Sequence, residues 1–161
     1  MSAANGRETP IDIRRAHETD AEEILTLQLL AYRSEAEFYD DCTIPPLTET
    51  IEQMRMDIDR QTVLKACAHG RIVGSVRARQ SGDRCMIGRL IVHPEWQRRG
   101  IGSRLLREIE SCFPETARFE LFTGERSEST IRLYVRMGYR VTRREAQTPK
   151  VGLVFLEKET V

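Results

Sequence analysis

The sequence predicts an α/β (α+β) fold in which a mixed central sheet of six to seven strands is covered by four helices. Two observations carry this prediction. Apolar residues recur with the period of helices in some stretches and with the period of strands in others, and both kinds occur along the chain. An apolar, strand-like stretch at 87–92 also leads through a polar turn opened by Pro94 into a helix whose first turn carries two glycines.

Length and composition indicate one soluble domain. The chain has 161 residues, enough for a single hydrophobic core, and its 25 basic and 25 acidic residues cancel. That balance favours neither nucleic acid nor a membrane as a partner. No apolar run could span a bilayer and the start lacks a signal peptide, so we expect a cytoplasmic protein. Residues 1–9 are expected to form a disordered tail and 10–161 a single domain.

The N-terminal part is predicted to contain one strand followed by two helices. Residues 11–14 alternate like a half-buried strand. Asp20 is expected to cap the first helix, with Glu23 completing a capping box. After two prolines, Thr48 can cap the second helix. The predicted buried faces are Ile24, Leu27 and Ala31 in the first helix, and Ile51, Met54 and Ile58 in the second.

From residue 62 onward the sequence predicts three strands, followed by alternating helices and strands. Turns at 69–71 and 81–83 separate three antiparallel strands. The strand at 119–123 follows a helix and is therefore expected to be parallel to the strand before it. The predicted elements are strands at 63–68, 72–79 and 85–92, a helix from 101 that ends at Pro114, a strand at 119–123, a helix capped by Ser127 and ended by Gly138, and strands at 139–143 and 151–158.

The start of the helix at 101 has the features of a phosphate site. The first backbone N–H groups of a helix have no carbonyl partner within it, and the helix dipole adds positive charge there. Gly100 and Gly102 let the backbone approach a ligand and adopt dihedral angles that a Cβ would forbid. Arg98, Arg99 and Arg104 add positive charge. Together these features predict a site for a diphosphate.

Spacing distinguishes between diphosphate-binding motifs. A P-loop needs a lysine, which this loop lacks, and a dinucleotide fingerprint needs a third glycine where Leu105 stands. The six residues from Gln97 to Gly102 instead resemble the acyl-CoA-binding motif of the GNAT superfamily of N-acetyltransferases. The predicted order of elements is also similar to that of the GNAT fold. The alternative is a glycine-bearing turn with solvated arginines.

The resemblance implies acetyl-CoA as co-substrate and assigns residues to it. In GNAT proteins the fourth and fifth strands splay apart, which frees backbone groups to bond the pantetheine arm. A second family signature is similar to residues 127–134, with Ser127 in place of the usual asparagine and Thr130 in place of the usual alanine. The implied cofactor-binding residues are Leu90, Ile91, Val92, Gln97, Arg98, Arg99, Gly100, Ile101, Gly102, Ser103, Ser127 and Tyr134.

Tyr134 is predicted to act as the catalytic acid. Aminolysis of a thioester expels a thiolate, and a phenol with a pKa of about 10 can protonate it. Similar enzymes use the tyrosine at this position in that role, whereas the alternative is a tyrosine that only fills the core. The general base stays open between Glu120 on the fifth strand, water held by backbone carbonyls, and His93 beside the loop.

The segment at 34–42 is expected to bind the acceptor, because the link between the first two helices commonly does so in the family. It holds four carboxylates around two aromatic rings, and Glu35, Phe38, Tyr39 and Asp40 could contact a cationic amine. A solvated helix end is the alternative. The predicted function is transfer of an acetyl group from acetyl-CoA to a primary amine of a small molecule or peptide, by direct attack in a ternary complex.

Further predictions concern metals, thiols and partners. The three histidines have no ligand residues clustered beside them, so no metal is expected. Three of the four cysteines fall on predicted strands or helices, where a thiol behaves as a small apolar side chain, and Cys42 in a loop is the one that could react. Two other functions stay open: a catalytically silent acyl-CoA-binding sensor or regulatory module, and an interaction protein that pairs through its last strands, which would also allow a homodimer.

Overall fold

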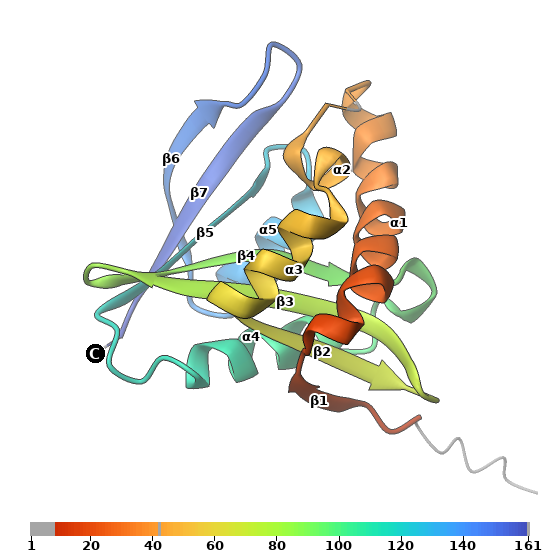
Figure 1. The fold of residues 1–161 in the computed structure, drawn as a ribbon. Coiled ribbons are helices and arrows are strands. Elements are labelled where there is room, and N and C mark those ends of the chain that lie inside the picture. The colour runs from red at the N-terminus through yellow and green to blue at the C-terminus, as the bar shows by residue number, and fades with distance from the viewer. Residues whose placement is uncertain (1–8, 42, 161) are drawn as a thin grey trace, which may run out of the picture.

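Seven strands form one mixed sheet, and helices cover both of its faces (Figure 1). The computed structural model describes residues 9–41 and 43–160, except for the side chains of 34, 35, 38 and 39. The strands are β1 (Asp12–Arg15), β2 (Thr62–Ala68), β3 (Arg71–Ser81), β4 (Arg84–Val92), β5 (Arg118–Gly124), β6 (Arg140–Ala146) and β7 (Gly152–Glu159). The helices are α1 (Ala21–Tyr39), α2 (Pro45–Thr48), α3 (Ile51–Arg60), α4 (Ile101–Ser111) and α5 (Glu128–Arg136), with single 3-10 turns η1 (Glu18–Asp20) and η2 (Pro94–Trp96).

The strand order is β1-β2-β3-β4-β5-β7-β6. Every neighbouring pair is antiparallel except β4 and β5, which are parallel. The predicted α+β class, the mixed sheet and the parallel strand after α4 are therefore confirmed. The expected disordered tail falls outside the described residues, apart from Thr9. Within the described ranges, none of the helices combines the length and the apolar character that crossing a membrane requires.

Two hydrophobic cores hold the helices against the two faces of the sheet. On one face, α4 buries Leu105, Leu106 and Ile109 completely, and α5 joins the same core through Tyr134. On the other face, α1 and α3 share a second core with residues of β2, β3 and β4. The helical spacing of these apolar residues puts them on one side of each helix. Each fully buried leucine or isoleucine stabilises the fold by about 1.5–3 kcal/mol.

The start of α3 differs from the prediction. Thr50, not Thr48, is its cap: the Thr50 hydroxyl accepts a hydrogen bond from the Gln53 N–H at 3.2 Å, and the Thr50 N–H donates to Gln53 Oε1 at 2.8 Å. Thr48 instead ends α2, a one-turn helix that Pro45 begins. Proline suits a first helical position because the N–H that it lacks would have no partner there. The prolines therefore open a short helix that the prediction did not include.

Asp20 does not cap α1 with its side chain, contrary to the prediction. Its carboxylate accepts hydrogen bonds from the His17 N–H and from Lys65 Nζ, each at 2.8 Å. Burial alone raises the pKa of this carboxyl, but the bonds from His17 and Lys65 outweigh burial and hold the pKa below its ordinary value. Asp20 therefore ties the start of α1 to β2.

Replacing Asp20 with asparagine is expected to lower the melting temperature by about 2–4 °C at pH 7, because Lys65 loses a charged partner worth about 1 kcal/mol. Folding lowers the pKa of this carboxyl, so its contribution is complete above the unfolded-state pKa of about 4 and is lost as the pH falls through the folded-state value. Thermal unfolding between about pH 7 and pH 2.5 should show the difference between D20N and the parent protein disappearing below about pH 4.

The control for this experiment is Asp12→Asn. Asp12 pairs with Arg14, but both side chains are largely exposed. Exposed pairs contribute little, so this variant should shift the melting temperature by less than about 2 °C at any pH. A D20N deficit that stays unchanged at about pH 3 would contradict the role assigned to the Asp20 carboxylate.

β4 and β5 separate along their length. They pair only through Arg84, Cys85 and Met86 of β4, although β4 continues to Val92 and β5 to Gly124. The other edge of each strand remains paired, β4 with β3 and β5 with β7. The facing edges beyond the short pairing are therefore open, which is the splay that the GNAT resemblance implied.

A bulge in β4 accompanies the separation. Arg77 of β3 lies opposite Gly88, whereas Ser75 lies opposite Ile91, so β4 contains one extra residue between these pairs. Within this stretch Arg89 has a φ of 50°, in the left-handed region. An extra residue of this kind bends the strand and re-aims side chains. The bulge thus lies in the part of β4 that is no longer paired with β5.

Candidate functional site

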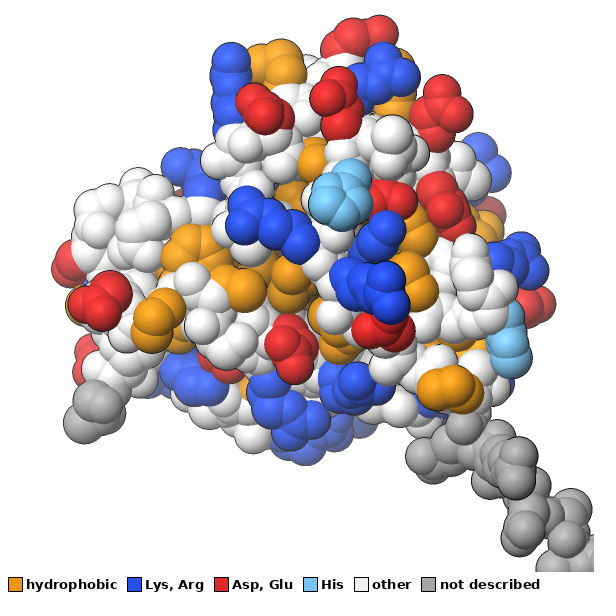
Figure 2. Space-filling model, turned by 60° about the horizontal axis from the view of Figure 1, so that its bottom comes forward, with side chains coloured by type: hydrophobic (Ala, Val, Ile, Leu, Met, Phe, Trp, Pro, Cys, Tyr) orange, Lys and Arg blue, Asp and Glu red, His pale blue; other side chains and the backbone are white. Residues whose placement is uncertain are grey.

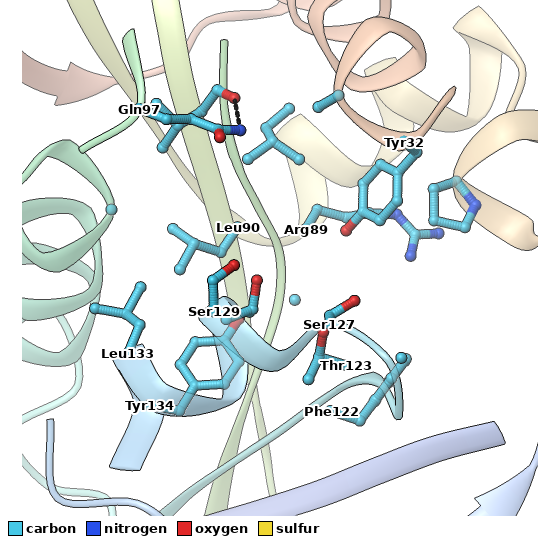
Figure 3. A pocket seen from close by; sticks show the side chains of 18 of the residues that line it. Tyr32, Arg89, Leu90, Gln97, Phe122, Thr123, Ser127, Ser129, Leu133 and Tyr134 are labelled. Carbon is cyan, nitrogen blue, oxygen red and sulfur yellow. Dashed lines mark hydrogen bonds between the residues drawn. The ribbon is translucent and has the colours of Figure 1, made fainter. Parts of the chain in front are cut away.

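A cleft of about 630 Å³ opens where β4 and β5 separate. Its walls are the second half of β4, the turn into α4, the end of β5 and the helix α5, while α1 and α2 close one side. Figure 3 shows this arrangement: Tyr32 and Arg89 lie on one side of the cleft and Leu133 and Tyr134 on another, with Leu90 of β4 between them.

Gly100 shapes the turn at one end of this cleft. It precedes α4 and has a φ of 77°, in the left-handed region. An added Cβ would meet nothing within 4 Å, so the backbone conformation, and not a close contact, requires glycine here. Gly102 lies inside the helix, and an added Cβ would stand 3.4 Å from the Leu133 side chain, an ordinary contact. The expectation of a special backbone conformation is therefore confirmed for Gly100 and wrong for Gly102.

The first N–H groups of α4 have no backbone partner. Among the described residues, no carbonyl accepts a hydrogen bond from Ile101, Gly102 or Ser103, and the first helical bond runs from the Arg104 N–H to the Gly100 carbonyl at 3.1 Å. Ile101, Gly102 and Ser103 all line the cleft. Because unpaired amides and the helix dipole both favour negative charge, this end of the cleft suits an anion.

The three arginines expected beside this turn lie in different places. Arg98 lines the cleft. Arg99 stacks on the Trp96 ring, with its guanidinium carbon 4.6 Å from the ring centroid, and is not part of the lining. Arg104 donates to the Ile11 carbonyl at 3.2 Å and so ties α4 to the start of the chain. Of the three arginines, Arg98 is therefore the one placed to meet a ligand in the cleft.

Most of the residues predicted to bind the cofactor line the cleft. Gln97, which follows the turn η2, donates from Nε2 to the Val92 carbonyl at 3.4 Å (Figure 3). Arg99 is the only one of the predicted set outside the lining. The predicted residues that line the cleft are Leu90, Ile91, Val92, Gln97, Arg98, Gly100, Ile101, Gly102, Ser103, Ser127 and Tyr134. Their contacts with a cofactor remain a prediction.

Tyr134 and Ser127 reach the cleft from α5. Tyr134 is 5% exposed, lines the cleft, and packs its ring beside that of Tyr139 at a centroid distance of 5.9 Å. Ser127 precedes α5 and also lines the cleft, although its side chain makes no capping hydrogen bond to the helix, contrary to the prediction. Helix α5 thus brings both residues of the second signature to one wall.

Glu120, one of the predicted candidates for the general base, is not part of the cleft lining. Its carboxylate is 1% exposed, lies 2.6 Å from Arg84 and 3.3 Å from Arg143, and so is held by two guanidinium groups. Glu120 stands opposite Met86, at the paired end of β4 and β5 and not in the splay. This position speaks against Glu120 as a base and indicates a structural ion pair.

The predicted acceptor segment lies differently from the expectation. Residues 34–39 continue α1 and are not a link between helices. The side chains of Glu35, Phe38 and Tyr39 lie outside the described residues. Asp40 ends α1 and is 97% exposed, with its carboxylate 3.5 Å from Lys150 Nζ, and it does not line the cleft. The acceptor role of Asp40 therefore finds no support in its position.

Neither His93 nor the described cysteines reach the cleft. His93 Nδ1 accepts a hydrogen bond from the Glu95 N–H at 3.1 Å and so caps the turn η2. Burial raises the pKa of the Cys85 thiol to about 12, which keeps it protonated at neutral pH. Cys42 lies outside the described residues. In the described ranges, no three His, Cys, Asp or Glu side chains stand together as a metal site.

Sequence reasoning missed several residues of the cleft lining, among them Arg89 and Tyr32. The available signal was an arginine within the otherwise apolar stretch 87–92. The described lining contains no aspartate or glutamate but four arginines, Arg89, Arg98, Arg126 and Arg136. On the molecular face in Figure 2, apolar side chains lie in the middle, and Lys and Arg as well as Asp and Glu side chains lie around them. The described lining therefore carries an excess of positive charge, although the whole chain has no net charge.

Comparisons with known proteins agree with this geometry. The family described as "Acetyltransferase (GNAT) domain" matches residues 59–141, just over half of the chain and including the loop before α4 and all of α5. A curated relative named UPF0157 protein YqkA, from Bacillus subtilis (strain 168), is 28% identical over 134 residues. That match covers 83% of this chain and 37% of the relative, so the chain spans little more than a third of the relative's length.

Solved structures share the fold over nearly the whole chain. The PaiA N-acetyltransferase of Thermoplasma acidophilum, in complex with coenzyme A, has a TM-score of 0.77 at 18% identity and covers 94% of this chain and 99% of that one. The yncA protein of Salmonella typhimurium, with its cofactor acetyl-CoA, has a TM-score of 0.73 at 17% identity and 94% coverage of both chains. With the family match and this fold together, the chain belongs to the GNAT acetyltransferase family.

Proposed function

We propose that the protein is an acetyl-CoA-dependent N-acetyltransferase that acts on a primary amine by direct attack in a ternary complex. The observation that carries the proposal is the presence, in one cleft, of the unpaired amides of Ile101, Gly102 and Ser103 and the side chain of Tyr134. The amides offer a diphosphate site, and Tyr134 offers a proton donor. Structural neighbours solved with coenzyme A or acetyl-CoA support the choice of ligand.

In this proposal the pantetheine arm of coenzyme A binds along the open edge of β4. Beyond Met86 the strand pairs with no described residue on the β5 side, so its peptide groups can bond an extended amide-bearing chain. Leu90 and Val92 also line the cleft there. A coenzyme A molecule held at one end by the α4 amides and along its arm by β4 would bring its thioester toward α5.

In the proposed reaction, the proton that Tyr134 gives to the thiolate is replaced by one from the amine. The amine nitrogen attacks the thioester carbonyl, the C–N bond forms, and the C–S bond breaks. Tyr134 donates its phenolic proton to the departing thiolate, and the proton that the nitrogen loses on becoming an amide restores the phenol. The described lining holds no carboxylate, which favours water held by the open carbonyls of β4 as the group that first deprotonates the ammonium.

Titration with coenzyme A tests the proposal, with Gly100→Ala as the site variant. Alanine at a left-handed position is strained by about 1–2 kcal/mol, so G100A should weaken coenzyme A binding by about tenfold. Gly82→Ala is a matched control, because Gly82 also has a positive φ and open space for a Cβ but lies in the β3–β4 turn. It should lose similar stability and keep its affinity for coenzyme A.

Three outcomes of the titration separate the candidate functions. Heat from coenzyme A together with thiol release from acetyl-CoA in the presence of amines supports the enzyme. Heat without thiol release for any amine tested would favour the silent binding module. No heat and no change in melting temperature with coenzyme A would overturn the proposal.

A further inference from the structure

Arg89 occupies an unusual position on the α1 side of the cleft. It lies at the bulge of β4 with a φ of 50°, between apolar neighbours in the sequence, and its side chain is 18% exposed. Tyr32 of α1 lies on the same side of the cleft (Figure 3), and Pro46 of α2 is also part of the lining. A guanidinium buried to this degree needs a counter-charge and hydrogen-bond acceptors.

The nearest carboxylate is already engaged by other groups. Glu49 Oε2 accepts from Gln28 Nε2 at 2.6 Å, and Glu49 Oε1 accepts from Arg77 at 2.9 Å. Arg89 Nε stands 3.9 Å from Glu49 Oε2, too far for a hydrogen bond. Arg77 bonds a second carboxylate, that of Asp57, at 2.9 Å. Glu49 therefore binds Arg77 and attracts Arg89, but it accepts no hydrogen bond from Arg89 Nε.

Arg89 has one donor that the described residues leave without a hydrogen bond. Its Nε is buried and has no hydrogen-bond partner among the described residues. Burial lowers the pKa of the Arg89 guanidinium, and Tyr32 and Glu49 partly offset that shift, but an arginine remains charged at neutral pH. The described lining offers no aspartate or glutamate as a partner. Arg89 therefore combines a buried Nε that has no hydrogen-bond partner among the described residues with a place in a cleft whose described lining holds no carboxylate.

We propose that the acceptor is an amine that also carries a carboxylate, and that Arg89 binds this carboxylate on the α1 side of the cleft. This inference rests on the proposed acetyltransferase function. A carboxylate can accept two parallel bonds from a guanidinium, and so offers hydrogen-bond acceptors that Glu49, at 3.9 Å, does not provide. Ile44 and Leu153, which also line the cleft, offer apolar surface for the body of the molecule.

The separation of the arginines along the cleft supports a division of roles. Arg98 lies in the loop before α4, and Arg126 and Arg136 lie beside and at the end of α5, whereas Arg89 comes from the bulge of β4 next to α1 and α2. The α4 amides and Arg98 provide for the phosphates of coenzyme A in the proposed function. Arg89 is therefore available for the second substrate.

A panel of matched acceptors tests the inference. Each amino acid is compared with its amide and with the amine that lacks the carboxylate, using acetyl-CoA and mass spectrometry of the products. We expect kcat/KM to be at least about tenfold higher for the carboxylated member of a reactive pair, because a charged hydrogen bond is lost in the other members. Arg89→Gln should remove this preference through KM and leave the Kd for coenzyme A within about twofold.

The control variant is Arg79→Gln. Arg79 is exposed on β3 and does not line the cleft, so the same chemical change there should alter neither KM nor the acceptor preference. Arg89→Lys keeps the charge but loses the planar fork, and it should fall between the parent protein and R89Q. Melting temperatures of all variants show whether each one folds.

A binding measurement tests the inference even if none of the amines in the panel is acetylated. Carboxylated amines are titrated into the complex of the protein with coenzyme A, and binding that R89Q weakens by about tenfold or more supports the inference. Equal or better use of amines without a carboxylate, or no binding of any carboxylated amine to that complex, overturns it. Because coenzyme A binding is measured first, these results leave the proposed function standing, whereas failure to bind coenzyme A defeats the proposed function itself.

Discussion

Replacing Tyr134 with phenylalanine is expected to lower kcat about 100-fold, with the Kd for coenzyme A within about twofold of the parent protein. Phenylalanine fills the same space on α5 but cannot protonate a thiolate. Tyr134 is 5% exposed and lines the same cleft as the second half of β4. The loss should appear in kcat and kcat/KM alike, because the proton is needed only as the C–S bond breaks.

Tyr139→Phe provides a matched control for this experiment. The Tyr139 ring lies beside Tyr134, but its hydroxyl donates to Glu110 Oε2 at 3.1 Å, and Lys158 binds the same oxygen at 2.9 Å. Burial and the Glu110 carboxylate raise the pKa of Tyr139 well above its ordinary value, so it stays protonated. Y139F should lose about 2 kcal/mol of stability and keep kcat within about twofold. Equal losses of kcat in both variants would contradict a chemical role for Tyr134.

Most helices and strands could be predicted from the sequence because residues within one short stretch determine them. Helical spacing of apolar residues identified the buried face of α4, and glycine-bearing turns identified the β2–β3 and β3–β4 hairpins. Helix starts were less predictable. Thr48 and Thr50 are both good caps, and the choice between them depends on whether the prolines begin a turn of helix, as they do in α2.

The two ends of the candidate site differ in how far sequence could predict them. The phosphate end depends on one contiguous stretch, where Gly100 and the start of α4 follow each other directly. The acceptor end depends on contacts between distant segments. Period-2 alternation shows that Glu120 and Phe119 face opposite ways, but not that Arg84 and Arg143 meet Glu120. Likewise, only the β4 bulge explains why Arg89 reaches the cleft from an apolar strand.

Glu120→Gln should destabilise the protein by about 3 kcal/mol and leave kcat within about twofold of the parent value. The change removes a buried negative charge and leaves Arg84 and Arg143 without their shared partner. Because both arginine side chains are more than 40% exposed, water screens part of the loss, which puts the expected value at the low end for a broken buried pair. Urea unfolding measures the stability, and thiol release with a reactive amine measures kcat.

Glu145→Gln separates the effect of burial from the effect of charge. Glu145 pairs with the same Arg143 at 2.9 Å, but its side chain is 54% exposed, so E145Q should change stability by less than about 1 kcal/mol. A protein in which E120Q retains its stability but loses turnover by 100-fold or more would restore Glu120 as the general base. Loss of stability with unchanged kcat would instead leave proton removal from the amine to water at the open edge of β4, since Glu120 lies where β4 and β5 are still paired.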